Sequence, residues 1–266
     1  MKKLSYLAIA FVAVAFAACG GQKSAQTTEE ADSLKSFEQQ QIEASIKMHF
    51  DSIASEISKL KQLPLVQSEN GLQLTKEEKQ VKPDYLLPTS VAEEAATLAE
   101  KYRILSALNV DQRIASLYEM PTEDYDKAIT KLAADINDPS FKAVEDANTL
   151  FETSSALYDA MDENGRINFF WQMAAAALVE ELYLTNQNAD KFLAAFDDDA
   201  AANVSFRIVL ILDAINRLSE YDTEIKPVAE ALAPLDVLNA VSVDELKAQL
   251  SEAKEKIDSA RKALVK

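Results

Sequence analysis

The sequence predicts an all-α fold, an irregular helical bundle or array of roughly eight to ten helices with no sheet. Glycine is scarce: the chain has four glycines in 266 residues, and Gly20 and Gly21 lie in a polar segment near the N-terminus. Sheet proteins depend on glycine for tight turns and bulges, and only Gly71 and Gly165 remain in the rest of the chain. This scarcity favours helices over a sheet. Apolar residues recur at steps of three and four through most of the chain, which is typical of amphipathic helices.

Residues 31–63 are expected to form one long first helix, which Pro64 ends. Its apolar positions follow the helical period: Leu34, Phe37, Ile42, Ile46, Phe50, Ile53, Ile57 and Leu60. The helix either packs along the domain or stands as a stalk. An irregular segment is expected over residues 64–88, where Thr75-x-x-Glu78 predicts a capping box for a short turn of helix.

The remaining helices are expected over residues 90–264, each placed by an N-terminal signal. These signals are Ser90, Asp111, Pro121-Thr122, Asp138-Pro139, Asn188, Asp197 and Ser242. Gly165 is expected to stop the helix that begins at Asp138. The segment 169–177 is apolar nearly all round, which predicts that its helix forms the buried centre of the fold.

The N-terminus has the pattern of an export signal. Two lysines follow Met1, and residues 4–16 form an apolar run of 13 residues, whereas a membrane-spanning helix needs about 20. This pattern predicts a secretory signal peptide over residues 1–18. Phe16-Ala17-Ala18-Cys19 resembles the lipobox of bacterial lipoproteins. The resemblance implies cleavage before Cys19 and a diacylglycerol on its sulfur, with a lipidated cysteine and flexible tether over 19–30 and an all-helical domain over 31–266.

Two alternatives compete with lipidation. Cys19 could follow an ordinary signal-peptidase site by chance, or the apolar run could remain as a membrane-spanning helix. Cys19 is the only cysteine, so the chain can form no internal disulfide, and attachment is the use that this position favours. The residues after Cys19 begin with Gly20 and include no acid through position 28. In lipoproteins this pattern implies sorting to the outer membrane, facing the periplasm.

The chain is strongly acidic. It has 44 acidic and 27 basic residues, and loss of Lys2 and Lys3 with the leader would change its formal net charge from −17 to −19. Such a body is repelled by nucleic-acid phosphates and by anionic lipid surfaces. We therefore expect no nucleic-acid partner, and membrane contact through the N-terminal lipid alone.

Several polar groups are candidates for chemistry, and each has a simpler interpretation. His49 is the only histidine, so a site built from several histidines is excluded, and a position at the edge of an apolar face is expected. Residues 162–167 resemble the middle of a calcium loop, but Ala160 and Trp171 stand where the loop needs acids, so a helix connector is expected.

The remaining candidates are acidic residues. The acids at 197–199 fit a helix N-cap better than a cation site. Glu180 and Glu181 diverge by about 100° on a helix and cannot form a catalytic pair with each other.

A run of aromatic residues gives the main alternative for function. Phe169, Phe170 and Trp171, together with Tyr85, could line a pocket for an apolar ligand, a glycan or a peptide, although aromatic residues at this spacing more often form core. No motif for a nucleophile, a phosphate loop or a dinucleotide is present. The sequence therefore predicts a non-enzymatic, lipid-anchored envelope protein, without cofactor or metal, that binds or scaffolds an unidentified envelope protein or ligand. An enzyme based on carboxylates is the third and weakest hypothesis.

Overall fold

The computed structural model describes residues 44–60, 63, 72–143 and 155–265. These residues contain helices and no strand, which confirms the predicted all-α fold. The chain divides into two compact units, residues 1–47 and residues 48–266. The expected signal peptide, Cys19, the tether over 19–30 and the first part of the long helix lie outside the described residues.

The described part begins with a helix over residues 44–57. The other α-helices are α2 (Lys76–Gln80), α3 (Val91–Glu94), α4 (Leu98–Leu117), α5 (Glu123–Ile136), α6 (Ser155–Glu163), α7 (Ile167–Gln187), α8 (Ala189–Phe192), α9 (Asp198–Ser219), α10 (Lys226–Leu232), α11 (Val243–Glu252) and α12 (Lys254–Leu264). Two 3₁₀ helices, Pro139–Ala143 and Ala233–Val237, connect them. The described region thus has more α-helices than the predicted eight to ten, partly because α2 lies in a segment expected to be irregular and the helix expected from Ser242 is divided into α11 and α12.

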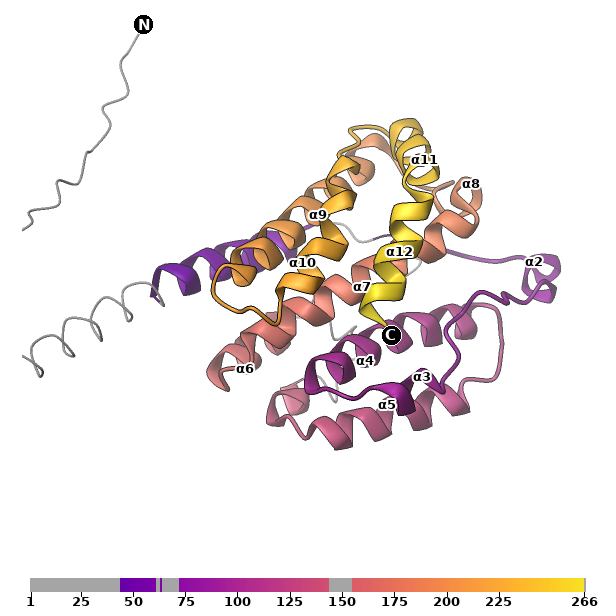
Figure 1. The fold of residues 1–266 in the computed structure, drawn as a ribbon. Helices are drawn as coiled ribbons and strands as arrows, with labels where there is room; N and C mark the ends of the chain where they lie inside the picture. The colour runs from indigo at the N-terminus through magenta and orange to yellow at the C-terminus, as the bar shows by residue number, and fades with distance from the viewer. Residues whose placement is uncertain (1–43, 61–62, 64–71, 144–154, 266) are drawn as a thin grey trace, which may run out of the picture. The chain divides into compact units, whose positions relative to one another are not determined.

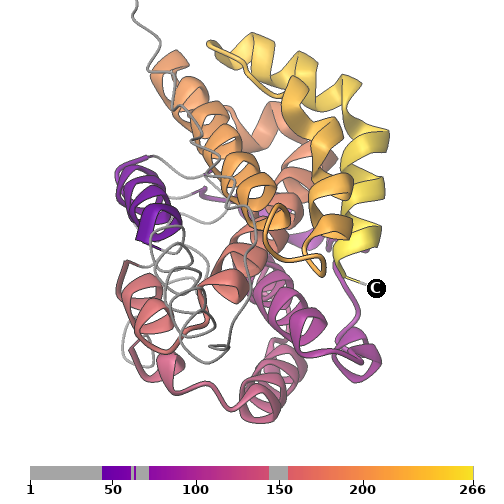
Figure 2. The same ribbon diagram turned by 60° about the vertical axis from the view of Figure 1, so that its left-hand side comes forward.

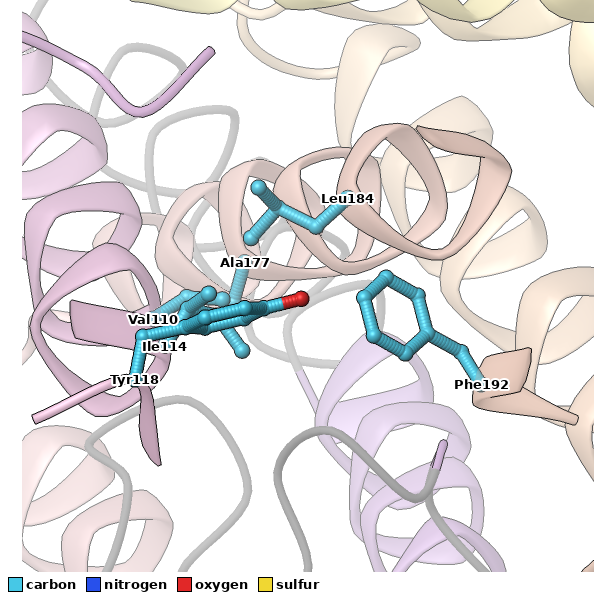
Figure 3. Packing of buried hydrophobic residues seen from close by; sticks show 6 residues of the cluster. All are labelled: Val110, Ile114, Tyr118, Ala177, Leu184 and Phe192. Carbon is cyan, nitrogen blue, oxygen red and sulfur yellow. The ribbon is translucent and has the colours of Figure 1, made fainter. Parts of the chain in front are cut away.

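Helix α7 forms the centre of the described unit, as its composition predicts. It packs against α4, α9 and α12, which come from distant parts of the chain (Figures 1 and 2). Every residue from Phe170 to Leu182 is buried, and Ala174, Ala175, Ala176 and Ala177 allow neighbouring helices to approach closely. An apolar cluster at one end of this helix joins three elements (Figure 3). It contains Val110 and Ile114 from α4, Tyr118 at the C-cap of α4, Ala177 and Leu184 from α7, and Phe192 from α8.

Most of the predicted helix boundaries with a clear local signal are confirmed. Thr75 and Glu78 form the expected capping box, and the side chains of Asn188, Asp197 and Ser242 each accept a backbone N–H at the start of a helix. Gly165 ends the region of α6 with a φ of +66°, a left-handed conformation that favours glycine.

The prediction for residues 90–120 was wrong in two respects. The helix at Ser90 ends after four residues, and α4 begins at Leu98 behind a second capping box, in which Thr97 and Glu100 bind each other's backbone N–H. Ser90 itself makes no capping hydrogen bond, so the better cap sets the start of the long helix. Helix α4 then continues through Asp111, which places this acid in the helix interior rather than at a helix start.

Three other boundaries also differ from expectation. The described part of the first helix gives way to a turn at residues 58–60, before Pro64. The segment expected as one helix from Asp138 to residue 162 is described as a 3₁₀ helix and α6, with residues 144–154 outside the described part. The last helix is divided at Ala253 into α11 and α12.

Candidate functional site

Helix α7 carries two adjacent carboxylates that are fully buried, Glu180 and Glu181. Consecutive residues on a helix point about 100° apart, so the two side chains enter different helix interfaces. Glu180 meets Asp111 of α4 and Arg261 of α12, and we call these three residues the Glu180 cluster. Glu181 meets Arg207 of α9, and we call this pair, with the neighbouring Thr185, the Glu181 cluster.

In the Glu180 cluster, Arg261 binds both carboxylate oxygens of Glu180. Its Nε lies 2.7 Å from Oε2 and its Nη2 lies 2.6 Å from Oε1, the paired geometry in which a guanidinium binds a carboxylate most strongly. The Arg261 guanidinium also lies over the Tyr183 ring, 3.7 Å from its centroid, and Nη2 donates to the Tyr85 carbonyl. These contacts fix α12 to α7 and to the segment that precedes α3.

Asp111 completes this cluster as a second buried acid. Its Oδ2 accepts the backbone N–H of Leu87 at 3.1 Å, while its Oδ1 has no donor partner. Burial, and then the neighbouring Glu180 charge, raise the pKa of Asp111 well above its usual value. Burial also raises the pKa of Glu180, against the opposing effect of Arg261. Because Arg261 binds both oxygens of Glu180 and so favours its charged form, the raised pKa of Asp111 makes this residue the one of the two acids that keeps a proton.

The Glu181 cluster is less completely paired. Arg207 Nη1 donates to Glu181 Oε2 at 3.1 Å, and both side chains are at most 1% exposed. The Nε and Nη2 atoms of Arg207 have no hydrogen-bond partner, and neither has Glu181 Oε1. Thr185, one helical turn beyond Glu181, has a buried hydroxyl without a partner. Burial raises the pKa of Glu181, and the charges of Arg207 and Arg113 oppose this rise.

The residues expected to bind a ligand lie in two places. Trp171 is fully buried and contacts the rings of Phe50, Tyr158 and Phe170, while Phe169 stacks on Tyr102. The indole Nε1 of Trp171 has no hydrogen-bond partner. Tyr85 packs instead against the Val110–Phe192 cluster. The structure therefore places Phe170 and Trp171 in the core, with the half-buried Phe169 stacked on Tyr102 at the start of the same helix, and it places Tyr85 beside a different part of the core.

The other polar candidates take local structural positions. His49 Nε2 lies 2.8 Å from Asp213 Oδ2 at the partly exposed junction of the first helix and α9. Asp197 caps α9, and Asp198 accepts the backbone N–H of Val243. Within the described ranges, no group of three or more histidine, cysteine, aspartate or glutamate side chains is placed to hold a metal ion.

Sequence reasoning missed four members of the two clusters: Asp111, Thr185, Arg207 and Arg261. A signal for them was present, because each occupies a position on an otherwise apolar helix face. Arg207 follows Val204 by three residues and precedes Ile211 by four, and Arg261 follows Ile257 by four residues and precedes Leu264 by three. A charged residue on an apolar face indicates a buried ion pair or a buried polar site.

Comparison with protein-family models, with curated proteins and with solved structures found no match to this chain. None of the helices in the described part combines the length and the apolar character needed to cross a membrane.

Proposed function

We propose that this chain is a lipid-anchored lipoprotein of the bacterial cell envelope, held on the outer membrane and facing the periplasm, whose helical domain binds or scaffolds another envelope component. The observation that carries the proposal is the position of Cys19. The only cysteine of the chain follows Phe16-Ala17-Ala18 at the end of a 13-residue apolar run.

The charge of the chain supports contact through lipid rather than through the protein surface. A net charge of −17 opposes adsorption to anionic lipids, so attachment depends on acyl chains. A single acyl chain gives only marginal membrane affinity. Stable attachment needs the several acyl chains of a mature lipoprotein, such as those of a diacylglycerol together with an N-terminal palmitate.

The two buried clusters support a non-enzymatic domain. Both oxygens of Glu180 are bound by Arg261, and the buried Asp111 of α4 accepts the backbone N–H of Leu87 in the segment before α3. Carboxyl groups that act as general acid and base must reach a substrate, whereas these two are bound to the scaffold. We therefore assign the Glu180 cluster to the joining of helices.

The anchor is tested by replacing Cys19. In the native host, Cys19→Ala should move the protein from the membrane to the soluble fraction and abolish incorporation of a labelled palmitate analogue. Ser24→Ala, a substitution in the tether that leaves the lipobox intact, serves as the matched control and should stay lipidated. A Cys19→Ala protein that remains with membranes in high salt would overturn the proposal. Crosslinking in intact envelopes, compared between these two variants, then identifies the component that the anchored domain binds.

A second candidate function is a pocket for an apolar ligand, a glycan or a peptide beside Phe169–Trp171. One observation favours it: the buried Trp171 Nε1 is a hydrogen-bond donor without an acceptor. Trp171 is the only tryptophan, so its fluorescence reports on this region alone. Titration with dodecanoate, chitobiose or a tripeptide should change the emission of the wild type if the pocket exists. Unchanged emission with all three probes would argue against this candidate.

A further inference from the structure

Asn164 precedes Gly165 in the turn between α6 and α7, and its side chain is exposed. In such a pair the backbone nitrogen of the glycine can attack the side-chain carbonyl carbon of the asparagine. The new C–N bond closes a succinimide ring, and the side-chain nitrogen leaves as ammonia with the proton that the glycine nitrogen gives up. Water then opens the ring to aspartate or isoaspartate. Because glycine has no Cβ to hinder the attack, asparagine is most labile when glycine follows it.

The structure holds both nitrogens of this reaction in hydrogen bonds. Asn164 Nδ2, the leaving nitrogen, donates to the Ala160 carbonyl at 2.7 Å and to the Ser140 hydroxyl oxygen at 3.2 Å. The attacking nitrogen of Gly165 donates its N–H to the Asp162 carbonyl at 3.0 Å. The attack needs the Gly165 nitrogen released from this bond and the Asn164 side chain turned toward it. Exposure to water is therefore not enough for the folded protein to react.

The bonds of Asn164 also join two helices. Ser140 is a buried residue of the 3₁₀ helix Pro139–Ala143, and its hydroxyl donates to the same Ala160 carbonyl at 3.1 Å. Ser140, Ala160 and Asn164 thus form a closed triangle of hydrogen bonds that fixes the end of α6 to the 3₁₀ helix. The Asn164 side chain is released only when this junction opens.

We propose that Asn164 is a deamidation site that the fold keeps closed, and that it reacts only when the junction between α6 and the 3₁₀ helix opens. After the reaction a carboxylate stands where the amide donated. It faces the Ala160 carbonyl, which is also an acceptor, at the C-terminal end of α6, where the helix dipole disfavours negative charge. The product therefore cannot remake the triangle, and the junction stays weakened. This inference uses described residues only and does not depend on the Cys19 anchor.

The test follows deamidation of the full chain in a non-ionic detergent at pH 8, in buffer and in guanidinium chloride. Peptide mapping by mass spectrometry distinguishes the fragment with Asn164 from the one with Asn70-Gly71, the other asparagine–glycine pair of the sequence. Conversion of Asn164 should be about tenfold or more faster in the denaturant, because opening of the junction limits the reaction of the folded protein. Equal rates in the two conditions, or no conversion in the denaturant, would overturn the proposal.

A serine variant places the protection at this junction. Ser140→Ala removes an acceptor of the Asn164 amide and should speed conversion in buffer about two- to tenfold, the effect of one lost hydrogen bond. Its rate in the denaturant should equal that of the wild type. Ser155→Ala, at an exposed serine at the start of α6, is the matched control and should react as the wild type does in both conditions. A Ser140→Ala protein that reacts at the wild-type rate in buffer would overturn the assignment to the junction.

Asn164→Asp copies the product and tests its effect on the fold. The midpoint of thermal unfolding should fall by about 2–4 °C, because the carboxylate faces an acceptor at a helix C-terminus. Asn168→Asp adds the same charge in the first turn of α7, where the helix dipole favours an acid, and should not lower the midpoint. An Asn164→Asp midpoint equal to that of the wild type would overturn the claim that the product weakens the junction.

Discussion

Glu180 and Arg261, 81 residues apart in the sequence, form a two-pronged ion pair between α7 and α12, with N–O distances of 2.7 and 2.6 Å. Glu180 is fully buried, and the Arg261 side chain is 14% exposed. Removing two charges from water costs several kcal/mol per ion, and only good geometry offsets this cost. The pair therefore makes the docking of the C-terminal helix depend on both residues being present.

Loss of one partner should cost far more stability than loss of both. Arg261→Met leaves the Glu180 carboxylate buried without its counterion, and should lower the free energy of unfolding by about 3–5 kcal/mol. The double variant Arg261→Met with Glu180→Met should recover most of this loss, since no charge then remains unpaired. Urea unfolding of Arg261→Met, of Glu180→Met and of the double variant measures the coupling energy between the two side chains. Lys254→Met, at an exposed pair on the same helix, is the control and should cost less than about 1 kcal/mol. Equal losses in the single and double variants would contradict the coupling.

Asp111→Asn should make the protein less sensitive to rising pH. Because the pKa of Asp111 is raised in the folded state above its usual 3.8, the folded chain keeps a proton that the unfolded chain releases. Its contribution is complete below pH 3.8 and is lost as the pH rises toward the folded pKa, by about 1.4 kcal/mol per pH unit. An asparagine can still accept the Leu87 N–H and donate to Glu180. Unfolding free energies measured between pH 4 and pH 8 should show the wild type losing stability relative to Asp111→Asn as the pH rises.

The control for this pH dependence has the opposite sign. The pKa of Glu100 is lowered, chiefly by the backbone N–H of Thr97, so its contribution is lost as the pH falls. Glu100→Gln should therefore reduce the loss of stability in acid and leave the slope toward alkaline pH unchanged. If Asp111→Asn unfolds with the same pH profile as the wild type, then Asp111 does not hold the proton.

The fold was more predictable than the buried clusters because its signals are local. Asn188, Asp197 and Ser242 each act on a backbone N–H three residues away, so a short window of sequence is enough to find them. The start of α4 was missed because Ser90 and Thr97 both have a glutamate three residues later, and only packing decides between them. Partners such as Arg261 for Glu180 lie too far apart in the sequence for any local rule to join them.

Gly165→Ala should destabilise the protein through its backbone alone. Gly165 has a φ of +66°, and a Cβ added there would meet no atom within 4 Å. Any cost therefore comes from the left-handed conformation, which disfavours alanine by about 1 kcal/mol or somewhat more. Gly165→Asn should cost less, because asparagine tolerates this conformation better. Chemical unfolding of the two variants gives the order, and an alanine variant as stable as the wild type would show that the turn adopts another conformation.

Tyr102→Phe should remove a buried hydrogen bond and also part of the alkaline sensitivity. The hydroxyl of Tyr102 donates to Asp138 Oδ2 at 2.6 Å, and Asp138 Oδ1 accepts the N–H of Ser140. Phenylalanine leaves one oxygen of a buried carboxylate unpaired, which should cost about 1–3 kcal/mol at pH 7. Burial, and then Asp138, raise the pKa of Tyr102 above its usual 10.0. Tyr102 in the unfolded chain therefore ionises first, and the wild type loses this contribution as the pH rises past 10.0.

Urea unfolding at pH 7 and pH 11 should show a smaller difference in stability between the wild type and Tyr102→Phe at the higher pH. Tyr221→Phe, at an exposed tyrosine, is the control and should stay within about 0.5 kcal/mol of the wild type at pH 7. A Tyr102→Phe protein as stable as the wild type at pH 7 would mean that this hydrogen bond does not hold the 3₁₀ helix at Asp138 to α4.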